Sequence, residues 1–372
     1  MNTGTQAAPP FRAEHIGSLL RPAELLQLRG KAAAGQVGPD ELTAAENMAI
    51  RSAAELQARV GLQLATDGEF RRQSYHSYFY EQLGDVLLEA PPDCTCSDDH
   101  GRGAQPQARI GSRLTWHRPI HVDDFRMLAS LTGALPKITI PGPCALHFRG
   151  GDAAVLASAY TDMDQFWDDT VRAYRSELTA LAEAGCTYVQ IDETAFAKFG
   201  DPDVQETLRV RGDDWSKLID TYIGVTNRVL DGLPPSLRIG MHLCRGNRGG
   251  KWHAEGSYES VADRLFNKLA IRFFFLEYDT PRAGSFTPLQ LVPQDKSVIL
   301  GLVSTKTAEM EDPGDLKRRL DDATRFVDMD RLGISPQCGF ASVDTGNPIS
   351  QEAQEAKLRL VVAVAQEVWG TC

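Results

Sequence analysis

Residues 161–193, TDMDQFWDDTVRAYRSELTALAEAGCTYVQIDE, contain one predicted helix followed by one predicted strand. In the first part of this stretch, apolar residues recur at helical spacing, and Gly185 follows where a helix would end. The run TYVQIDE, at 187–193, has the residue types of a buried strand and finishes on two acids. The stretch therefore predicts a helix that leads into a strand with a polar end.

The same unit recurs along the whole chain. Helical patterns lie at 22–35, 41–61, 215–233, 258–270, 312–328 and 352–370. Eight strands are predicted: 15–20 (HIGSLL), 62–69 (LQLATDGE), 137–143 (KITIPGP), 187–193, 238–244 (RIGMHLC), 272–279 (RFFFLEYD), 297–303 (SVILGLV) and 332–340 (LGISPQCGF). Eight strands that alternate with helices predict the α/β class and a (β/α)8 TIM barrel.

One stretch, at about 84–135, interrupts the alternation. It contains PPDCTCSDDHGRGAQPQ and then RLTWHRPIHVDDFRML, which favour an exposed loop and a β-ribbon over a barrel helix. We therefore expect a flexible N-terminus over 1–10 and a single barrel domain over 11–372 with an insertion after the second strand. Cys94, Cys96 and His100 in the insertion are metal-ligand types, but a loop of this composition is their commoner context. The role of the insertion stays open.

Composition narrows the classes of partner. A net charge of −11 argues against nucleic acid, because phosphate binding needs a basic face. No apolar run approaches the roughly 20 residues that span a bilayer, and the first residues lack the features of a signal peptide. Seven cysteines without a framework spacing indicate reduced thiols. We expect a cytoplasmic protein that acts on small molecules and binds no membrane; a homodimer is left open.

Polar residues gather at the predicted strand ends. In a TIM barrel, these ends and the loops after them form the catalytic face. The residues concerned are Ser18, Asp67, Glu69, Asp192, Glu193, His242, Cys244, Glu277, Lys306 and Cys338. We expect them to converge on one face of the barrel.

Four of these residues have the chemistry of zinc ligands. His242 and Cys244 are one residue apart, and Glu277 and Cys338 end later apolar runs. Imidazole, thiolate and carboxylate suit a borderline-soft divalent ion, and a tetrahedral site of this kind can exchange one ligand. The alternative is that each is a packed core side chain. Because a metal keeps a bound substrate thiol deprotonated, the set predicts a zinc enzyme that alkylates sulfur.

Other strand-end residues suit substrate binding or proton transfer. An ionised acid inside a barrel needs a cation or several donors, so Glu69 and Asp192 are predicted to bind an amino group or to act as general bases. The alternative is a structural ion pair with Arg71, Arg72 or Arg245. Ser18, with Gly17, can offer its hydroxyl and backbone N–H groups to a carboxylate. His15 and His76 are candidates for proton relay, and Asp67 for a turn or cap.

Several motifs resemble the catalytic barrel of cobalamin-independent methionine synthase. HIGSLLRP is similar to that family's Ile-Gly-Ser strand, TDGEFRR to its Gly-Glu turn and YVQIDETA to its Gln-Ile-Asp-Glu strand, while HLC and PQCG resemble its zinc-binding motifs. The resemblance extends from about Phe11 to Gly370. It implies zinc on His242, Cys244, Glu277 and Cys338, and binding of a homocysteine-type amino acid by Ser18, Glu69 and Asp192.

The chain also departs from the full-length synthases. Its 372 residues leave no room for their N-terminal barrel, and PGPCALHFRG has no counterpart of the tryptophan on which folate stacks. Lys306 lies at about the place of a histidine in that family's proton relay. The loop HLCRGNRGGKW is more similar to short single-barrel relatives, and its Arg245 and Asn247 are candidates to bind a carboxylate, phosphate or sulfonate, or to anchor the loop.

The leading hypothesis is a zinc-dependent thiol S-methyltransferase that methylates homocysteine or a related thiol. The donor is left open among a methylated folate, a methylcobamide on a partner protein and a small metabolite. Besides the substrate-binding set, we expect catalytic roles for Glu69, Asp192, Lys306 and His15. The alternative is a zinc-dependent alkyltransferase that joins a thiol to another electrophile by epoxide opening or ether cleavage. A decarboxylase with a structural or absent zinc and a non-enzymatic binding protein are the remaining hypotheses.

Overall fold

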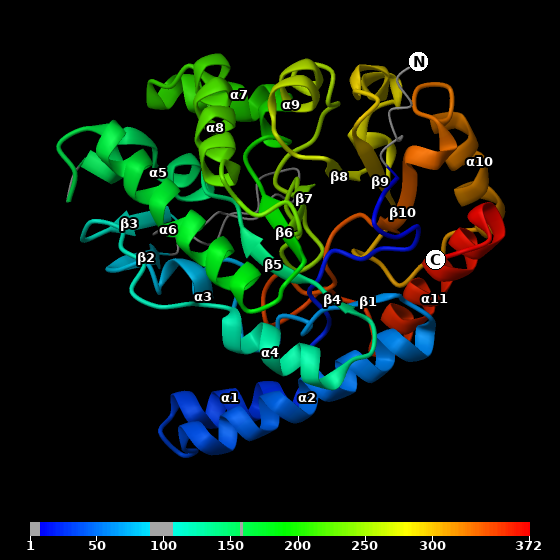
Figure 1. The fold of residues 1–372 in the computed structure, drawn as a ribbon, viewed down its shortest axis with the longest axis horizontal. Helices are drawn as coiled ribbons and strands as arrows, with labels where there is room; N and C mark the ends of the chain where they lie inside the picture. Colours follow the sequence, from blue (N-terminus) through cyan, green and yellow to red (C-terminus); the bar gives the residue numbers. More distant parts are fainter. Residues whose placement is uncertain (1–7, 90–106, 157–158) are drawn as a thin grey trace.

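A parallel barrel forms the centre of the computed structural model, which describes residues 8–89, 107–156 and 159–372 (Figure 1). Six parallel strands form its main sheet and lie side by side in chain order. They are β5 (Ile138–Pro141), β6 (Tyr188–Glu193), β7 (Arg238–Leu243), β8 (Phe273–Glu277), β9 (Ser297–Val303) and β10 (Leu332–Pro336). Each was predicted as a strand, because a strand covered on both faces is a short, nearly continuous apolar run.

Short segments complete the ring between β10 and β5. β1 (Leu64–Ala65) pairs in parallel with β4 (Leu135–Pro136), which is separated from β5 only by Lys137. On the other side of β1, Thr66 Oγ1 donates to Gly17 O over 2.7 Å, and Ala13 forms a parallel bridge with Ile334 of β10. The segment around 13–18 therefore takes the place of the first strand, and the predicted (β/α)8 TIM barrel is confirmed.

The predicted strand at 15–20 is wrong in its bounds. Pairing with β10 occurs at Ala13, before the predicted start, and no regular strand is assigned between residues 15 and 20. The reason is local: Gly17 has a φ of 138°, which interrupts an extended ladder. The interruption places Ser18 beside the loop that follows β10, since Ser18 O accepts from Phe340 N at 3.0 Å.

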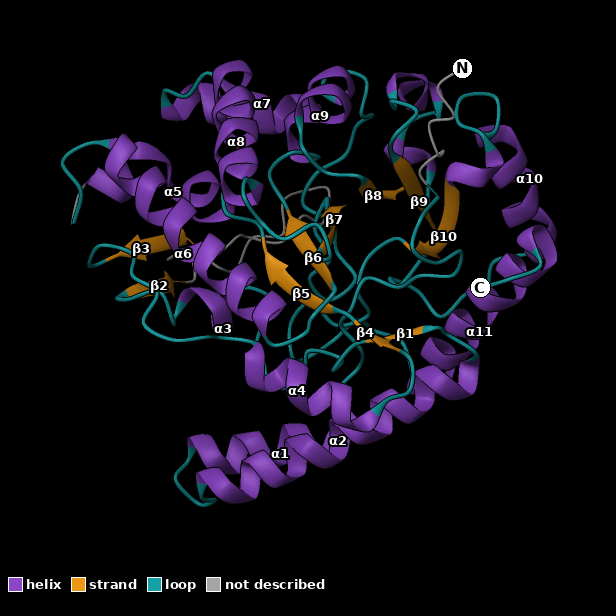
Figure 2. Cartoon of the chain, viewed as in Figure 1, coloured by secondary structure: helices purple, strands orange, loops and turns teal. Residues whose placement is uncertain are grey.

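Helices surround the strands on the outside of the barrel (Figure 2). They are α1 (Ala23–Ala33), α2 (Pro39–Val60), α3 (Ser77–Tyr80), α4 (Val122–Leu131), α5 (Ala145–Leu156), α6 (Met163–Glu183), α7 (Pro202–Arg211), α8 (Trp215–Leu230), α9 (Ala262–Lys268), α10 (Pro313–Ala323) and α11 (Gln351–Trp369). Asp162 caps α6 by accepting from Gln165 N, as an N-cap residue does. Among the described residues, no helix is long and apolar enough to cross a membrane.

The insertion differs in part from the prediction. A β-ribbon is present, because β2 (Val86–Glu89) pairs antiparallel with β3 (Gln107–Ile110). Residues 122–131, however, which were expected in the loop and ribbon, form helix α4 against α2. Val122, Phe125 and Leu128 recur every three residues and are buried, so they form one apolar helix face. Residues 1–7, expected to be flexible, and Cys94, Cys96 and His100 lie outside the described residues.

Candidate active site

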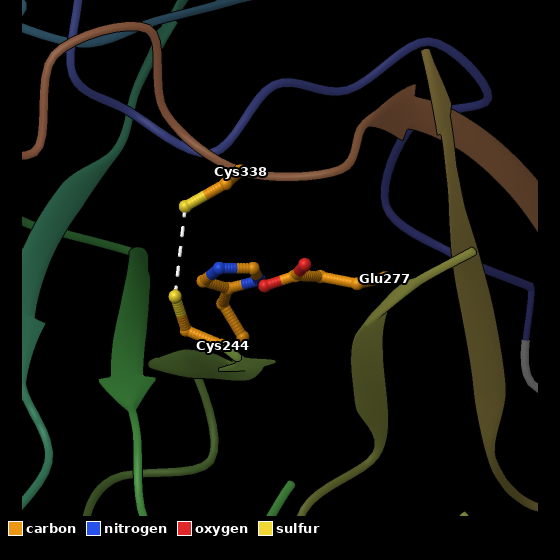
Figure 3. Close-up of side chains that lie close together, drawn as sticks. Cys244, Glu277 and Cys338 are labelled. Carbon is orange, nitrogen blue, oxygen red and sulfur yellow. Dashed lines mark hydrogen bonds between the residues drawn. The ribbon is translucent and has the colours of Figure 1, made fainter. Parts of the chain in front are cut away.

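Four side chains from distant parts of the chain meet at the carboxyl ends of the strands. His242 belongs to β7 and Cys244 follows it, while Glu277 is the last residue of β8 and Cys338 comes two residues after β10. One potential ligand atom from each lies within 4.8 Å of the others. Figure 3 shows Cys338 above Cys244, with the carboxylate of Glu277 reaching toward them from the side. These are the four residues that the sequence predicts as metal ligands.

The geometry of this group fits a tetrahedral metal ion. The Sγ atoms of Cys244 and Cys338 are 3.6 Å apart, and two zinc–sulfur bonds of about 2.3 Å at a tetrahedral angle would separate them by about 3.8 Å. Within the described residues, both ring nitrogens of His242 and Oε2 of Glu277 are buried without a hydrogen-bond partner. Buried polar atoms are normally partnered, so these atoms are suitably placed to bind a metal ion.

Glu277 is held in place by groups behind it. Its Oε1 accepts the backbone N–H of Arg245 at 2.7 Å. Arg282 Nη2 lies 3.5 Å and Lys306 Nζ 4.0 Å from its Oε2. These positive charges offset the burial of a carboxylate that is 0% exposed. The surroundings therefore orient Glu277 in the way that outer groups commonly orient a metal ligand.

A cavity of about 320 Å³ opens beside the four-residue group. His242, Cys244 and Cys338 contribute to its wall, together with the predicted substrate-binding residues Ser18, Glu69, Asp192 and Asn247. The two cysteine sulfurs and both predicted carboxylates therefore face the same cavity. The volume suits a small molecule.

Glu69 has an unusual backbone conformation. Its φ is 60°, and within the described residues it is the one non-glycine residue with a positive φ. Such strain tends to persist where a side chain must be placed for function. Glu69 Oε1 accepts from Thr139 Oγ1 at 2.9 Å, and Arg72 Nη1 is 3.8 Å from the same oxygen. The other oxygen, Oε2, is buried without a hydrogen-bond partner in the described structure, so it can accept one from a ligand.

Asp192 supplies a second carboxylate to the same cavity. Its Oδ1 accepts from Gln190 Nε2 at 2.7 Å. Burial, with a contribution from the charge of Glu69, raises the pKa of Asp192 to about 7. Two buried carboxylates that repel each other would be stabilised by a cation between them. This pair therefore suits the ammonium group of an amino acid.

Ser18 is packed tightly against the loop that carries Cys338. Its Oγ accepts from Ala341 N at 3.3 Å. A Cβ atom on Gly339 would lie 1.9 Å from that oxygen, so a side chain at 339 would displace Ser18. This close approach explains the glycine of the Cys-Gly motif, and it joins the first barrel segment to the last.

The structure differs from the prediction for three candidate residues, none of which lines the cavity. The guanidinium of Arg245 donates to Tyr258 Oη at 3.0 Å and to Gly256 O at 2.9 Å, behind Glu277. Lys306 Nζ lies 3.2 Å from Asp279 Oδ2. His15 is buried in the barrel, where burial and the charge of Lys137 lower its pKa well below the usual value. This geometry therefore favours structural roles for these three side chains over direct contact with a substrate.

Two further candidates have structural partners. Asn247 lines the cavity, but its Nδ2 donates to Thr305 Oγ1 and Gly339 O at 2.9 and 2.8 Å. It therefore anchors the loop, which is the alternative weighed from the sequence. Asp67 accepts from Glu69 N at 2.9 Å and so stabilises the turn, as expected.

The cavity wall also contains residues that are not among the predicted site residues. Tyr75, Arg149, Arg248 and His253 all lie on the lining. They come from loops and from α5, where no strand end marks them. Tyr75 Oη accepts from Arg149 Nη2 at 3.3 Å. For Tyr75, the available signal was the density of polar and aromatic residues in RRQSYHSYFY, immediately after the Gly-Glu turn, and for Arg248 it was the loop HLCRGNRGGKW.

His76, considered as a proton relay, does line the cavity. Its Nδ1 is 2.9 Å from Ser74 Oγ, which leaves Nε2 as the nitrogen for a ligand. Burial, together with the charges of Arg149, Lys198 and Arg248, lowers the pKa of His76 well below its usual value. His76 is therefore neutral at pH 7 in the absence of an anion.

Comparison with known proteins gives a consistent picture. The family model described as the catalytic domain of cobalamin-independent synthase matches residues 11–250. YxjH and YxjG of Bacillus subtilis (strain 168), both uncharacterised, are each 38% identical to the chain; the matches cover 99% and 97% of this chain and 97% and 95% of theirs. A 5-methyltetrahydropteroyltriglutamate–homocysteine methyltransferase of Mycolicibacterium paratuberculosis is 25% identical over 97% of this chain and 43% of its own length.

Solved structures share the fold. A Listeria monocytogenes protein assigned provisionally to the vitamin-B12-independent methionine synthases superposes with a TM-score of 0.75 at 31% identity, over 98% of this chain and 100% of its own. A B12-independent methionine synthase of Shewanella shares the fold, with a TM-score of 0.70 at 21% identity over 99% of this chain and 96% of its own. The resemblance inferred from the motifs is confirmed: the chain belongs to the family of the cobalamin-independent synthase catalytic domain.

Proposed function

We propose that the protein is a zinc-dependent S-methyltransferase that methylates the sulfur of homocysteine or a closely related amino-acid thiol. The observation that carries the proposal is the convergence of His242, Cys244, Glu277 and Cys338 on one point. Three of them, His242, Cys244 and Cys338, line a cavity that is also lined by the carboxylates of Glu69 and Asp192. Family membership supports an enzyme of the methionine synthase type. The identity of the metal and that of the thiol substrate are proposed here in addition to what family membership supports.

Zinc is the metal that these ligands suit best. Two thiolates, one imidazole and one carboxylate match the ligand types of tetrahedral zinc sites. Zinc bound there would keep a substrate sulfhydryl deprotonated near neutral pH, and the thiolate is the nucleophilic form. Glu277 is the weakest donor for a soft ion among the four, so it is the ligand that an incoming sulfur would replace.

The rest of the cavity positions the amino acid. Glu69 Oε2 has no hydrogen-bond partner in the described structure, and Asp192 lies in the same cavity; both are available to the substrate ammonium group. The hydroxyl of Ser18 is available to the substrate carboxylate. Anchoring both charged groups would direct the sulfur toward the metal ligands, which reduces the entropic cost of the reaction.

The overall transfer is a substitution at carbon. A bond forms between the thiol sulfur and the methyl carbon while the bond from that carbon to the donor breaks. The electron pair of the broken bond leaves with the donor, and the proton that the thiol has lost goes to the demethylated donor or to water. Atoms and charge therefore balance without an oxidant or a further reactant.

The methyl donor is proposed by class only. A methylated folate is one candidate, because a curated relative is named for 5-methyltetrahydropteroyltriglutamate, although this chain matches 43% of that protein. A methylcobamide on a partner protein and a small methylated metabolite are the others.

The test is to incubate zinc-loaded protein with homocysteine and each donor class and to detect methionine by mass spectrometry. A Cys338→Ala variant is the negative control, and Cys186→Ala is the matched control, because Cys186 is buried before β6 and away from the ligand group. The proposal is supported if the wild type and Cys186→Ala form methionine and Cys338→Ala does not. A sulfur product with a larger alkyl group, or product from Cys338→Ala at the wild-type rate, contradicts it.

A further inference from the structure

A lysine occupies the interior of the barrel. Lys137, between β4 and β5, is 0% exposed. Its Nζ donates to Glu14 Oε2 at 2.9 Å, to Gln190 Oε1 at 3.0 Å and to the carbonyl oxygen of His15. These three acceptors use all three hydrogens of the ammonium group. The lysine is therefore fully partnered, and its position is fixed by two other segments of the barrel.

The lysine in turn fixes the orientation of a neighbouring amide. An ammonium group can only donate, so the end of Gln190 that faces Lys137 must be its carbonyl oxygen. The amide nitrogen then points the other way, where it donates to Ile16 O and, at 2.7 Å, to Asp192 Oδ1. Lys137 thus determines that the Gln190 amide presents its N–H donor, and not its carbonyl oxygen, to Asp192.

The amide joins both sides of the proposed amino-acid site. Gln190 and Asp192 are two residues apart on β6, so their side chains share one face of the strand. Ile16 belongs to the segment that carries Ser18, and both Ile16 and Asp192 line the cavity. One side chain therefore sets the position of the carboxylate and of the neighbouring backbone segment together.

Packing alone does not explain this arrangement. The neighbours of Lys137 inside the barrel include the rings of Tyr188 and Phe275, 5.6 and 5.0 Å from its Nζ. An apolar residue would fill the same space without the cost of burying a charge, and such replacements are often neutral or stabilising. The ion pair of Lys137 with Glu14 is connected through Gln190 to the carboxylate of Asp192 in the cavity. Positioning of that carboxylate explains the buried charge better than packing does.

We propose that Lys137 and Gln190 are positioning residues that determine recognition of the substrate's α-amino group by holding Asp192 in place. The inference rests on the proposed function, because it concerns the binding of an amino-acid thiol. Neither residue touches the substrate. Their effect is on which thiol binds, and not on whether a thiol reaches the metal ligands.

The experiment compares two thiols that differ only by the amino group. Homocysteine and 4-mercaptobutyrate are titrated into cobalt-substituted protein, and the cobalt absorption bands report sulfur binding without a methyl donor. Wild-type protein is expected to bind homocysteine more tightly. In Gln190→Met, the dissociation constant for homocysteine is expected to rise about tenfold or more, while that for 4-mercaptobutyrate changes less than about twofold.

Matched variants separate positioning from damage to the fold. Gln354→Met removes another buried glutamine, whose Oε1 accepts from Leu20 N outside the cavity lining, and is expected to keep the wild-type ratio of the two constants. Lys137→Met leaves Glu14 buried without its cation, so the double variant Glu14→Gln, Lys137→Met is made as well. It is expected to lose the preference for homocysteine in the same way as Gln190→Met.

The outcomes are distinct. An unchanged ratio in Gln190→Met, or an equal weakening of both thiols, overturns the positioning role and leaves the zinc–thiol proposal intact. Equal binding of the two thiols by the wild type also overturns it, since there is then no amino-group recognition to position. If neither thiol changes the cobalt bands of the wild type, the proposed function fails and this inference fails with it.

Discussion

The Sγ atoms of Cys244 and Cys338 lie 3.6 Å apart, although 94 positions separate the two residues in the chain. Cys244 follows β7 and Cys338 follows β10, and the parallel barrel brings both strand ends to one rim. Two thiols at this separation, next to an imidazole and a carboxylate without full hydrogen bonding, form the most specific feature of the molecule.

Removal of one sulfur should abolish stable metal binding. We expect Cys338→Ala to reduce the zinc content after dialysis to a small fraction of the wild-type value, because three ligands remain and one of them is a carboxylate. Metal analysis by mass spectrometry measures this directly. Cys186→Ala is expected to retain the wild-type content. Full zinc in Cys338→Ala would show that this cysteine is not a ligand.

Neutralisation of Glu69 should weaken binding of the amino-acid thiol. Glu69→Gln keeps the shape of the side chain but loses the charge that faces an ammonium group, so we expect the dissociation constant for homocysteine to rise about tenfold or more. Binding of 4-mercaptobutyrate should change little, since it has no amino group. The same cobalt titration measures both. Equal effects on the two thiols would count against ammonium recognition by Glu69.

Arg245 provides a test between a structural and a substrate-binding role. Its Nη1 donates to Tyr258 Oη and Glu277 O and its Nη2 to Gly256 O, so Arg245→Lys replaces two fixed donor nitrogens by a single one. We expect metal affinity to fall by about tenfold or more, as for other groups behind a metal ligand. The affinity ratio of homocysteine to 3-aminopropanethiol, which lacks the carboxylate, should stay at its wild-type value. A collapse of that ratio would restore the carboxylate-binding role predicted from the sequence.

An ion-pair cluster outside the site should make stability depend on pH. Asp124 accepts from Arg71 Nε at 2.8 Å and lies 3.0 Å from His121 Nδ1. Burial alone would raise the pKa of Asp124, but the His121 hydrogen bond and the arginine charges outweigh it and lower the pKa. A carboxyl with a lowered folded-state pKa stabilises the fold above its unfolded-state pKa of about 4, and this contribution is lost as the pH falls through the folded-state value.

We therefore expect Asp124→Asn to lower the free energy of unfolding by about 2 kcal/mol at pH 7. The difference from the wild type should begin to narrow below about pH 4, where the carboxyl of the unfolded chain takes up a proton, and should be lost as the pH falls through the lower folded-state pKa. Urea unfolding at a series of pH values measures it. The neighbouring Asp123→Asn, at an exposed position, is the control and should have little effect. A difference that is constant from pH 7 to pH 3 would contradict the assignment.

The sequence was sufficient for the six strands of the main sheet and for the polar residues at or near their ends. A buried parallel strand is a contiguous apolar run, and in a barrel its last residue must face the rim, so His242 and Glu277 could be assigned to one place without coordinates. Helix α4 was missed because prolines and polar residues precede it, although Val122, Phe125 and Leu128 have helical spacing. The helical periodicity was present, but the loop-like composition of the preceding residues favoured a loop and ribbon in the prediction.

Side-chain direction could not be predicted in the same way. Lys306 and Arg245 both follow strand ends, but whether such a residue faces the cavity depends on the path of its loop, and both turn behind Glu277. Tyr75 and Arg149 reach the cavity from segments that no periodic pattern marks. Lys137 had no visible signal at all, since its role depends on an amide from another strand.

The most direct test of the account combines metal content with thiol binding on one sample. Purified protein should contain about one zinc ion per chain, and after substitution with cobalt its absorption bands should change when homocysteine is added. Protein that binds no zinc at this site, or cobalt bands that do not respond to homocysteine, would contradict the central claim that these four residues present a metal to an external sulfur.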